Sequence, residues 1–162
     1  MRTIPLLLTI AVLELGARAA VAQRVTAWEV GMASLDEDVR LLQVGYRASW
    51  VNPGHVGVDF SVAASPVGLL SLFIHGALDL DAAYAVVLDS ATSLHLRAGG
   101  TAFVAASQYG AGLTGGFNVG FGIVGRTSAT SGIRLDVVQR WFPTEYETYS
   151  ATSVTVGIAV FR

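Results

Sequence analysis

Charged side chains are the residues of this sequence best placed to do chemistry, and some of them recur at every second position. Asp79 and Asp81 flank Leu80, and in an extended strand residues two apart project from one face. Their carboxylates would then lie about 6–7 Å apart. Such a pair could form an acid–base or cation site, or it could supply two acceptors for arginines such as Arg97 or Arg47. We favour the second interpretation because arginine is plentiful here.

Histidines are the next candidates for chemistry. His55 falls in a predicted turn, His75 near the start of a predicted strand, and His95 within another. A lipid-modifying enzyme would need a histidine, an acid and a serine together; His75, Asp79 and Ser71 supply these types without a motif that joins them. A single histidine with scattered partners does not make a metal site. The sequence therefore predicts no catalytic residue, no metal site and no cofactor.

The composition narrows the class of protein. The 162 residues are 52% hydrophobic and only 14% charged, whereas soluble domains carry about 25% charged residues. The absence of cysteine excludes disulfides and thiolate metal sites, and the formal net charge of −2 argues against a nucleic-acid partner. Beyond the N-terminal segment, no apolar run approaches the roughly 18 residues of a membrane helix. The chain is as apolar as a membrane protein but lacks the helix that would explain it.

The N-terminal segment has the pattern of an export signal. Arg2 precedes an apolar stretch at residues 4–13, and Ala20-Val21-Ala22 gives small residues at the spacing of a cleavage site. This order of features is typical of a secretory signal peptide. We therefore expect residues 1–22 to be removed and residues 23–162 to form one domain. The alternative is that the segment is an N-terminal helix of the mature fold.

The rest of the chain alternates between apolar and other residues, which indicates β-strands. Near the C-terminus, for example, Val154, Val156, Ile158 and Val160 are separated by Thr155, Gly157 and Ala159. No segment keeps a helical stripe. Turn-forming residues divide the chain into eight alternating segments, which we expect to be strands near 25–35, 39–51, 55–64, 72–88, 93–105, 112–128, 132–142 and 151–162.

Charges of both signs gather on the face of each strand opposite the bulky apolar residues. A soluble sandwich also has one apolar face, but most of these strands span 10–17 residues, longer than the roughly 5–6 usual in soluble sheets. Five arginines balance five acids, which suits a narrow interior because buried charges require partners. We therefore predict a structural polar network inside a closed sheet, made of Glu29, Arg47, Asp59, Asp79, Asp81, His95, Arg97, Arg126, Arg134, Asp136 and Arg140.

Small and aromatic residues complete this pattern. Glycines 99, 120, 122 and 157 share the charged face, where they would leave room for large arginine side chains in a tight eight-stranded interior. Aromatic residues gather toward the ends of the predicted strands, as they do in the interfacial girdles of transmembrane barrels. They are Trp28, Tyr46, Trp50, Tyr84, Trp141 and Phe142.

From residue 23 to residue 162 the chain resembles small bacterial outer-membrane β-barrels of the OmpA/OmpX-like type. The resemblance rests on the signal peptide, the eight alternating segments and the polar interior face. It implies an all-β fold: an eight-stranded antiparallel up-and-down transmembrane β-barrel in the outer membrane of a Gram-negative-type bacterium. It departs from the family in one respect: the apolar alternation of the last strand leads to Arg162, and Phe161 falls on the other face.

The resemblance also implies partners and a role. Outer-membrane lipid, lipopolysaccharide and the barrel-insertion machinery are the expected partners, the protein is expected to be a monomer, and no nucleic acid is expected. We expect a non-enzymatic barrel with a structural or surface-interaction role. The alternatives are a small barrel that transports or binds small apolar ligands, a lipid-modifying outer-membrane enzyme, and a soluble lipocalin-like carrier.

Overall fold

A computed structural model describes residues 23–35, 39–65, 73–107, 110–143 and 147–162. No helix within these residues is long and apolar enough to cross a membrane. The predicted signal peptide lies outside them. The described residues form eight strands: β1 (Arg24–Leu35), β2 (Val39–Trp50), β3 (Val56–Ala64), β4 (Phe73–Val87), β5 (Thr92–Ser107), β6 (Gly110–Arg126), β7 (Ser131–Pro143) and β8 (Thr148–Phe161).

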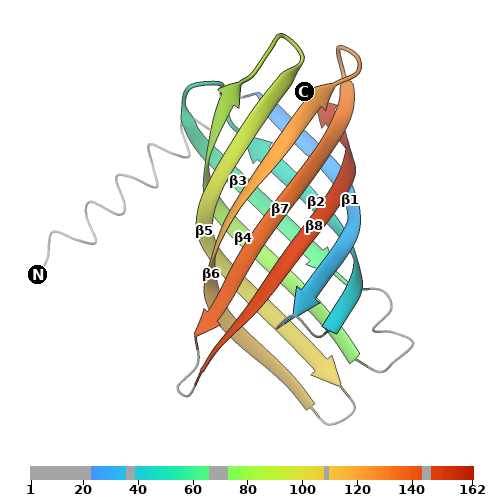
Figure 1. The fold of residues 1–162 in the computed structure, drawn as a ribbon, viewed down its shortest axis with the longest axis vertical. Helices are drawn as coiled ribbons and strands as arrows, with labels where there is room; N and C mark the ends of the chain where they lie inside the picture. Colours follow the sequence, from blue (N-terminus) through green and yellow to red (C-terminus); the bar gives the residue numbers. More distant parts are fainter. Residues whose placement is uncertain (1–22, 36–38, 66–72, 108–109, 144–146) are drawn as a thin grey trace, which may run out of the picture.

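The eight strands close into one antiparallel barrel (Figure 1). Each strand pairs with its neighbours in sequence, and β1 also pairs with β8, from Val25 opposite Phe161 to Leu35 opposite Ala151. The predicted fold class is therefore confirmed. The largest difference in bounds is at the start of β8, because polar residues Thr148 and Ser150, predicted as loop, continue the pairing with β7.

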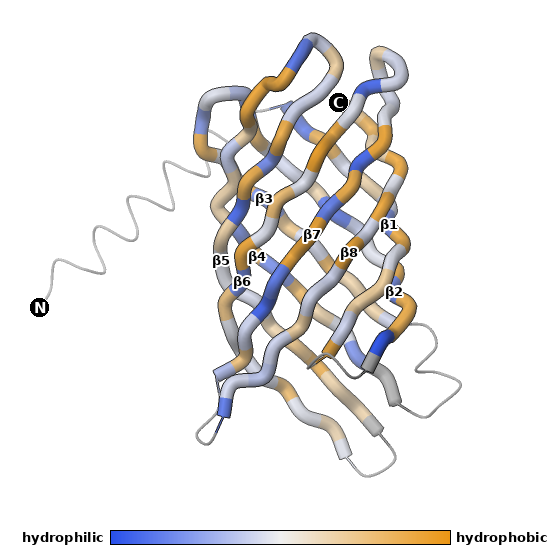
Figure 2. Tube along the Cα trace, in the orientation of Figure 1, coloured by the Kyte–Doolittle hydropathy of each residue, from blue (hydrophilic) through white to orange (hydrophobic). Residues whose placement is uncertain are grey.

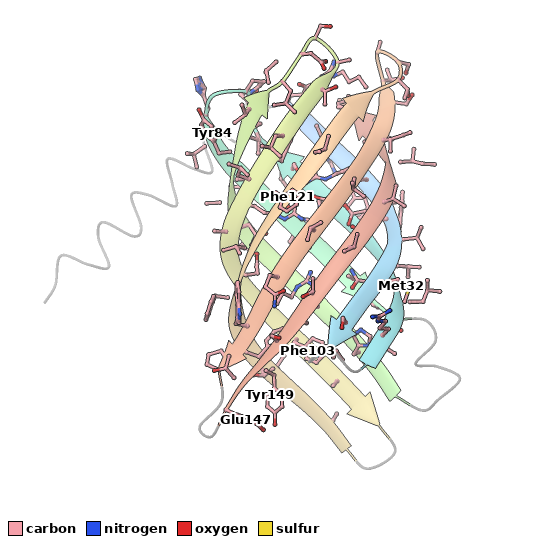
Figure 3. The ribbon with its side chains drawn as sticks, in the orientation of Figure 1. Met32, Tyr84, Phe103, Phe121, Glu147 and Tyr149 are labelled. Atoms are coloured by element: carbon pink, nitrogen blue, oxygen red, sulfur yellow. The ribbon has the colours of Figure 1, made fainter. Side chains whose placement is uncertain are left out.

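The outer face of the barrel is apolar. Trp28 is 73% exposed and Ile158 69% exposed, and Figure 3 shows Met32 and Tyr84 projecting away from the barrel. Figure 2 shows hydrophobic residues alternating with polar ones along the strands. An exposed apolar surface that surrounds the whole sheet marks contact with a partner or with lipid. This outer face is the reverse of the usual arrangement in a soluble protein.

Buried apolar residues gather in the interior at the end where β1 begins and β8 ends. Val25, Ala27, Val124, Ala159 and Phe161 form one buried cluster there, and Val51, Ala83 and Ala85 form a second.

The turn between β2 and β3 folds back onto β4 at the same end. The amide of Gly54 donates to the carbonyl of Ala85 at 2.9 Å, and Pro53 forms an isolated bridge with the same residue. Gly54 has φ of +75°, a conformation that glycine adopts without the steric cost of a side chain. The turn therefore holds Val51 inside the barrel end.

Aromatic side chains occupy the interior near the opposite end. The rings of Phe103 and Phe142 lie 5.1 Å apart, and the ring of His75 lies 5.8 Å from that of Phe103. Phe142 is 3% exposed. The prediction that Phe142 belongs to an outer aromatic girdle is therefore wrong. Phe142 packs inside the barrel because its position in β7 belongs to the inward-facing set.

Candidate functional site in the barrel interior

The structure buries ten of the eleven residues predicted for the polar network, with exposed fractions from 0% for Asp79 and Arg134 to 7% for Glu29. Arg126 is the exception. It ends β6 at the barrel rim, where its side chain is exposed and its guanidinium carbon lies 4.3 Å from the ring centroid of Phe161. The described interior therefore holds four arginines and five acids, and not the five of each that were predicted.

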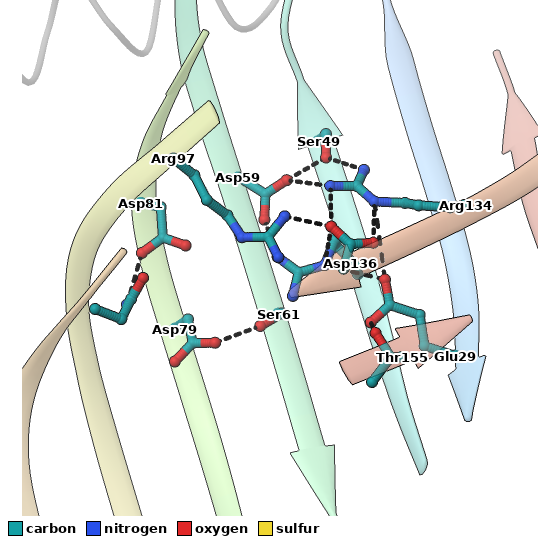
Figure 4. Close-up of polar contacts among 12 residues, drawn as sticks. Glu29, Ser49, Asp59, Ser61, Asp79, Asp81, Arg97, Arg134, Asp136 and Thr155 are labelled. Atoms are coloured by element: carbon teal, nitrogen blue, oxygen red, sulfur yellow. Dashed lines mark hydrogen bonds and ion pairs between the residues drawn. The ribbon is translucent and has the colours of Figure 1, made fainter. Parts of the chain in front are cut away.

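Three arginines and three acids form a central cluster (Figure 4). Arg47 on β2 bonds to both neighbouring strands: its Nε donates to Glu29 Oε1 at 3.0 Å, and its Nη1 donates to Asp59 Oδ1 at 2.5 Å. Thr155 on β8 donates to the other oxygen of Glu29 at 3.1 Å. The central cluster consists of Glu29, Arg47, Asp59, Arg97, Arg134 and Asp136.

Arg134 links β7 to residues far away in sequence. Its Nε donates to Asp136 Oδ2 at 2.7 Å, its Nη1 to Ser49 Oγ at 2.8 Å, and its Nη2 to Asp59 Oδ2 at 3.3 Å. Ser49 also donates to Asp59, and Arg97 donates to Asp136. All three nitrogens of Arg134 thus have acceptors, which is the condition for burying a guanidinium without a large penalty.

Arg140 and Asp79 form a second, separate ion pair. Nε and Nη2 of Arg140 donate to the two carboxylate oxygens of Asp79 at 2.9 and 2.6 Å, a bidentate geometry that is stronger than a single hydrogen bond. Ser61 adds a bond to Asp79 at 2.8 Å. The remaining nitrogen of Arg140 donates to Ser153 at 2.7 Å, and Ser153 donates to Gln43 at 3.2 Å.

Asp81 lies in a third environment. Nδ2 of Asn118 donates to Asp81 Oδ1 at 2.9 Å and to the carbonyl of Gly100 at 3.2 Å. Among the described residues, no arginine lies within 4 Å of Asp81. His95 is also buried, and its Nε2 lies 3.1 Å from Ser93 Oγ.

Asp79 accepts from an interior arginine, as predicted, but its partner is Arg140 and not one of the two arginines named as examples. Neither Arg97 nor Arg47 pairs with either carboxylate, because the acids of the central cluster bind both arginines. Arg140 forms the ion pair with Asp79. The two acids do share one strand face, as their spacing predicts, but they have different partners.

Glycines make room for this network. A Cβ added at Gly122 would lie 2.2 Å from Asp136 Oδ1, and one added at Gly120 would lie 2.9 Å from Arg97 Nε. Both contacts are shorter than van der Waals separation. The glycines of the charged face therefore leave space for acids as well as for arginines.

Small hydroxyl residues are the part of the network that sequence reasoning missed. Ser49, Ser61, Ser153 and Thr155 each bond to a charged or amide side chain of the interior. All four belong to the inward-facing set, so the alternation could have identified them. Serine and threonine occur on both faces of many sheets, however, and the residue type alone gave no reason to select them.

A cavity of about 200 Å³ lies at the end where β1 begins and β8 ends. Its lining includes His95, Val124, Arg126 and Phe161, with Asp89 at the turn between β4 and β5. The backbone amide of Ala91 donates to Asp89 at 2.7 Å, and this bond holds the pKa of the carboxyl below its usual range. The rim of the cavity thus carries one positive and one negative group.

The geometry of the interior is one of mutual neutralisation. Each acid of the central cluster, and Asp79, accepts a hydrogen bond from at least one arginine. In the part of the chain that the structure describes, no three His, Asp or Glu residues are arranged to hold a metal ion.

A comparison with protein-family models finds no match, and a comparison with curated proteins finds no significant relative. Solved structures do match. Neisserial surface protein A superposes with a TM-score of 0.63 at 10% identity, over 85% of this chain and 95% of that one. The N-terminal β-barrel domain of Pseudomonas aeruginosa OprF gives 0.61 at 12% identity, over 85% and 97%.

A third structure, the outer membrane protein OprG from Pseudomonas aeruginosa, gives a TM-score of 0.57 at 8% identity, over 87% of this chain and 96% of that one. At these identities the likeness concerns the fold alone. The closed eight-stranded sheet, its apolar outer face and these superpositions lead to one conclusion: the chain has the OmpA/OmpX-like fold of eight-stranded outer-membrane β-barrels.

Proposed function

We propose that this chain is a non-enzymatic integral outer-membrane protein whose interior is closed, with a structural or surface-interaction role in the envelope of a Gram-negative-type bacterium. In this proposal residues 1–22 direct export, and residues 23–162 insert into the outer membrane as a monomer with the help of the insertion machinery. Membrane lipid and lipopolysaccharide surround the barrel.

The observation that carries the proposal is the central cluster. Its three arginines and three acids cross-link β1, β2, β3, β5 and β7 through the middle of the barrel. Opening a pore would separate these pairs, and a charge left buried without its partner costs roughly 3–5 kcal/mol. The apolar clusters near the ends add a second barrier to ions.

Two measurements test the proposal. We expect the purified protein to require detergent or lipid for solubility, because its outer face is apolar. We also expect planar bilayers that contain the folded protein to show no conductance above background. Stable channels would contradict the closed interior, and a monomer that stays soluble without detergent would support the lipocalin-like alternative.

The cavity at the end where β1 begins and β8 ends supports a second candidate function, the binding of a small apolar molecule. Val25, Val51, Val124 and Phe161 supply apolar lining, and its volume of about 200 Å³ exceeds that of an engineered cavity of about 150 Å³ that binds benzene. Titration with benzene, followed by NMR shifts of these residues, tests it. We expect Val124→Trp, which fills the cavity, to abolish the shifts. Shifts that persist in this variant would place the binding elsewhere.

A further inference from the structure

The environment of Asp81 contains buried polar atoms that the protein itself does not satisfy. Among the described residues, no hydrogen-bond partner reaches Asp81 Oδ2, Asn118 Oδ1, or Nε and Nη2 of Arg97. The three side chains are 3%, 2% and 5% exposed. Buried polar groups of folded proteins nearly always have a partner, either in the protein or in ordered water.

Strand pairing brings these three side chains together. Asp81 on β4 lies opposite Gly99 on β5, and Gly99 lies opposite Asn118 on β6. Because Gly99 has no side chain, Asn118 reaches across β5 and bonds to Asp81. Arg97 is two residues from Gly99 on the same inward face, and Figure 4 shows its guanidinium directed toward Asp136.

A second glycine makes room for the side chain of Arg97. Arg97 lies opposite Gly120 on β6, and a Cβ at Gly120 would approach Arg97 Nε to 2.9 Å. Nε of Arg97 therefore packs over the backbone of Gly120, in the place that a side chain at position 120 would fill. Nη1 of Arg97 is bonded to Asp136, which fixes the guanidinium in this orientation.

The four unsatisfied atoms are two donors and two acceptors. Nε and Nη2 of Arg97 donate, whereas Asp81 Oδ2 and Asn118 Oδ1 accept. A metal cation there would face the guanidinium, and an anion would face the Asp81 carboxylate. A water molecule accepts two hydrogen bonds and donates two, and buried waters typically make about three bonds to such groups.

We propose that the barrel binds a structural water molecule among Arg97, Asp81 and Asn118, which joins Asp81 to the central cluster through Arg97. The inference goes beyond the proposed function and does not depend on it, since a closed or an open barrel can hold such a site. Asp81 is then compensated through water and not by a direct ion pair.

NMR of the folded protein in lipid nanodiscs tests this site through the Nε–H protons of two arginines. We expect a rotating-frame Overhauser cross-peak between water and the Arg97 Nε–H. Its sign should be that of a dipolar contact and not that of chemical exchange. The Arg134 Nε–H, which is bonded to Asp136, is the matched control and should show none. Absence of the Arg97 cross-peak, or equal cross-peaks for both arginines, would overturn the proposal.

A variant adds an independent check. Asn118→Leu has a similar volume but removes the amide, which supplies the Oδ1 acceptor for the water and the Nδ2 donor to Asp81. We therefore expect the Arg97 cross-peak to be lost or reduced several-fold. The matched change Gln139→Leu, on the outer face of β7, should preserve it. An unchanged cross-peak in Asn118→Leu would overturn the assignment. If Asn118→Leu does not fold, a crystal structure of the unaltered protein decides: water between Arg97 and Asp81 supports the proposal, and a direct contact between them refutes it.

Discussion

The central cluster and the Asp81 environment occupy the same barrel interior but satisfy their charges differently. In the central cluster each carboxylate bonds directly to at least one arginine, and Arg134 has an acceptor for every nitrogen. Asp81 bonds directly only to the neutral amide of Asn118 among the described residues. Both places are buried to a similar degree.

The difference follows from the number of charges. Arg126 leaves the interior at the rim, so four buried arginines face five buried acids. Three arginines serve the central cluster and the fourth serves Asp79. Asp81 is the acid left without a direct arginine partner among the described residues. Burial alone therefore does not determine how strongly a charged residue supports the barrel.

The largest expected effect is at the best-paired residue. Arg134→Ala would leave Asp136 and Asp59 with fewer donors inside the barrel, and removing one partner of a buried pair costs about 3–5 kcal/mol. Urea unfolding in lipid vesicles measures the loss. Arg40→Ala, at an exposed position of β2, is the control and should be nearly neutral. An equal, small effect in both variants would show that the central cluster contributes little.

The two kinds of acid can be compared by one chemical change. Asp136→Asn should cost about 3–5 kcal/mol, because it removes the charge that Arg134 and Arg97 bind. Asp81→Asn keeps the acceptor for Asn118 and should cost about 1 kcal/mol or less. The same unfolding experiment measures both, and equal losses would remove the distinction between the two environments.

Space beside the central cluster is tested by glycine substitution. Gly122→Ala would push its Cβ into the Asp136 carboxylate, and overpacking of this kind costs about 1–3 kcal/mol. Gly115→Ala lies in the same strand and meets no atom within 4 Å, so it is the matched control. A loss of stability that is equal in the two variants would point to the strand backbone and not to the crowded carboxylate.

The smallest effect is expected at the rim. Arg126→Ala removes a contact between the guanidinium and the Phe161 ring, which is worth about 0.5–1 kcal/mol at an exposed position. The same unfolding assay should therefore show a loss well below that of Arg134→Ala. A loss as large as that of Arg134→Ala would mean that Arg126 belongs to the interior network after all.

The sequence by itself determined the eight strands and, for most residues within them, the face on which each side chain lies. Strand pairing preserves the period of two along each segment, so Asp59, Arg97 and Arg134 could be assigned to one face before any contact was known. The alternation was less informative at strand ends. Arg126 and Phe142 both follow it, but Arg126 lies at the exposed rim against Phe161, and Phe142 packs against the ring of Phe103.

Only the tertiary structure decided which charges pair. Arg134 bonds to Ser49, 85 residues away in sequence, and Arg140 bonds to Asp79, 61 residues away. These partners lie on strands that are not neighbours in the sheet, so spacing along one strand contains no information about them. Closure of the barrel determines which side chains meet across the interior. Each long arginine side chain then bonds to the acids and hydroxyl groups within its reach.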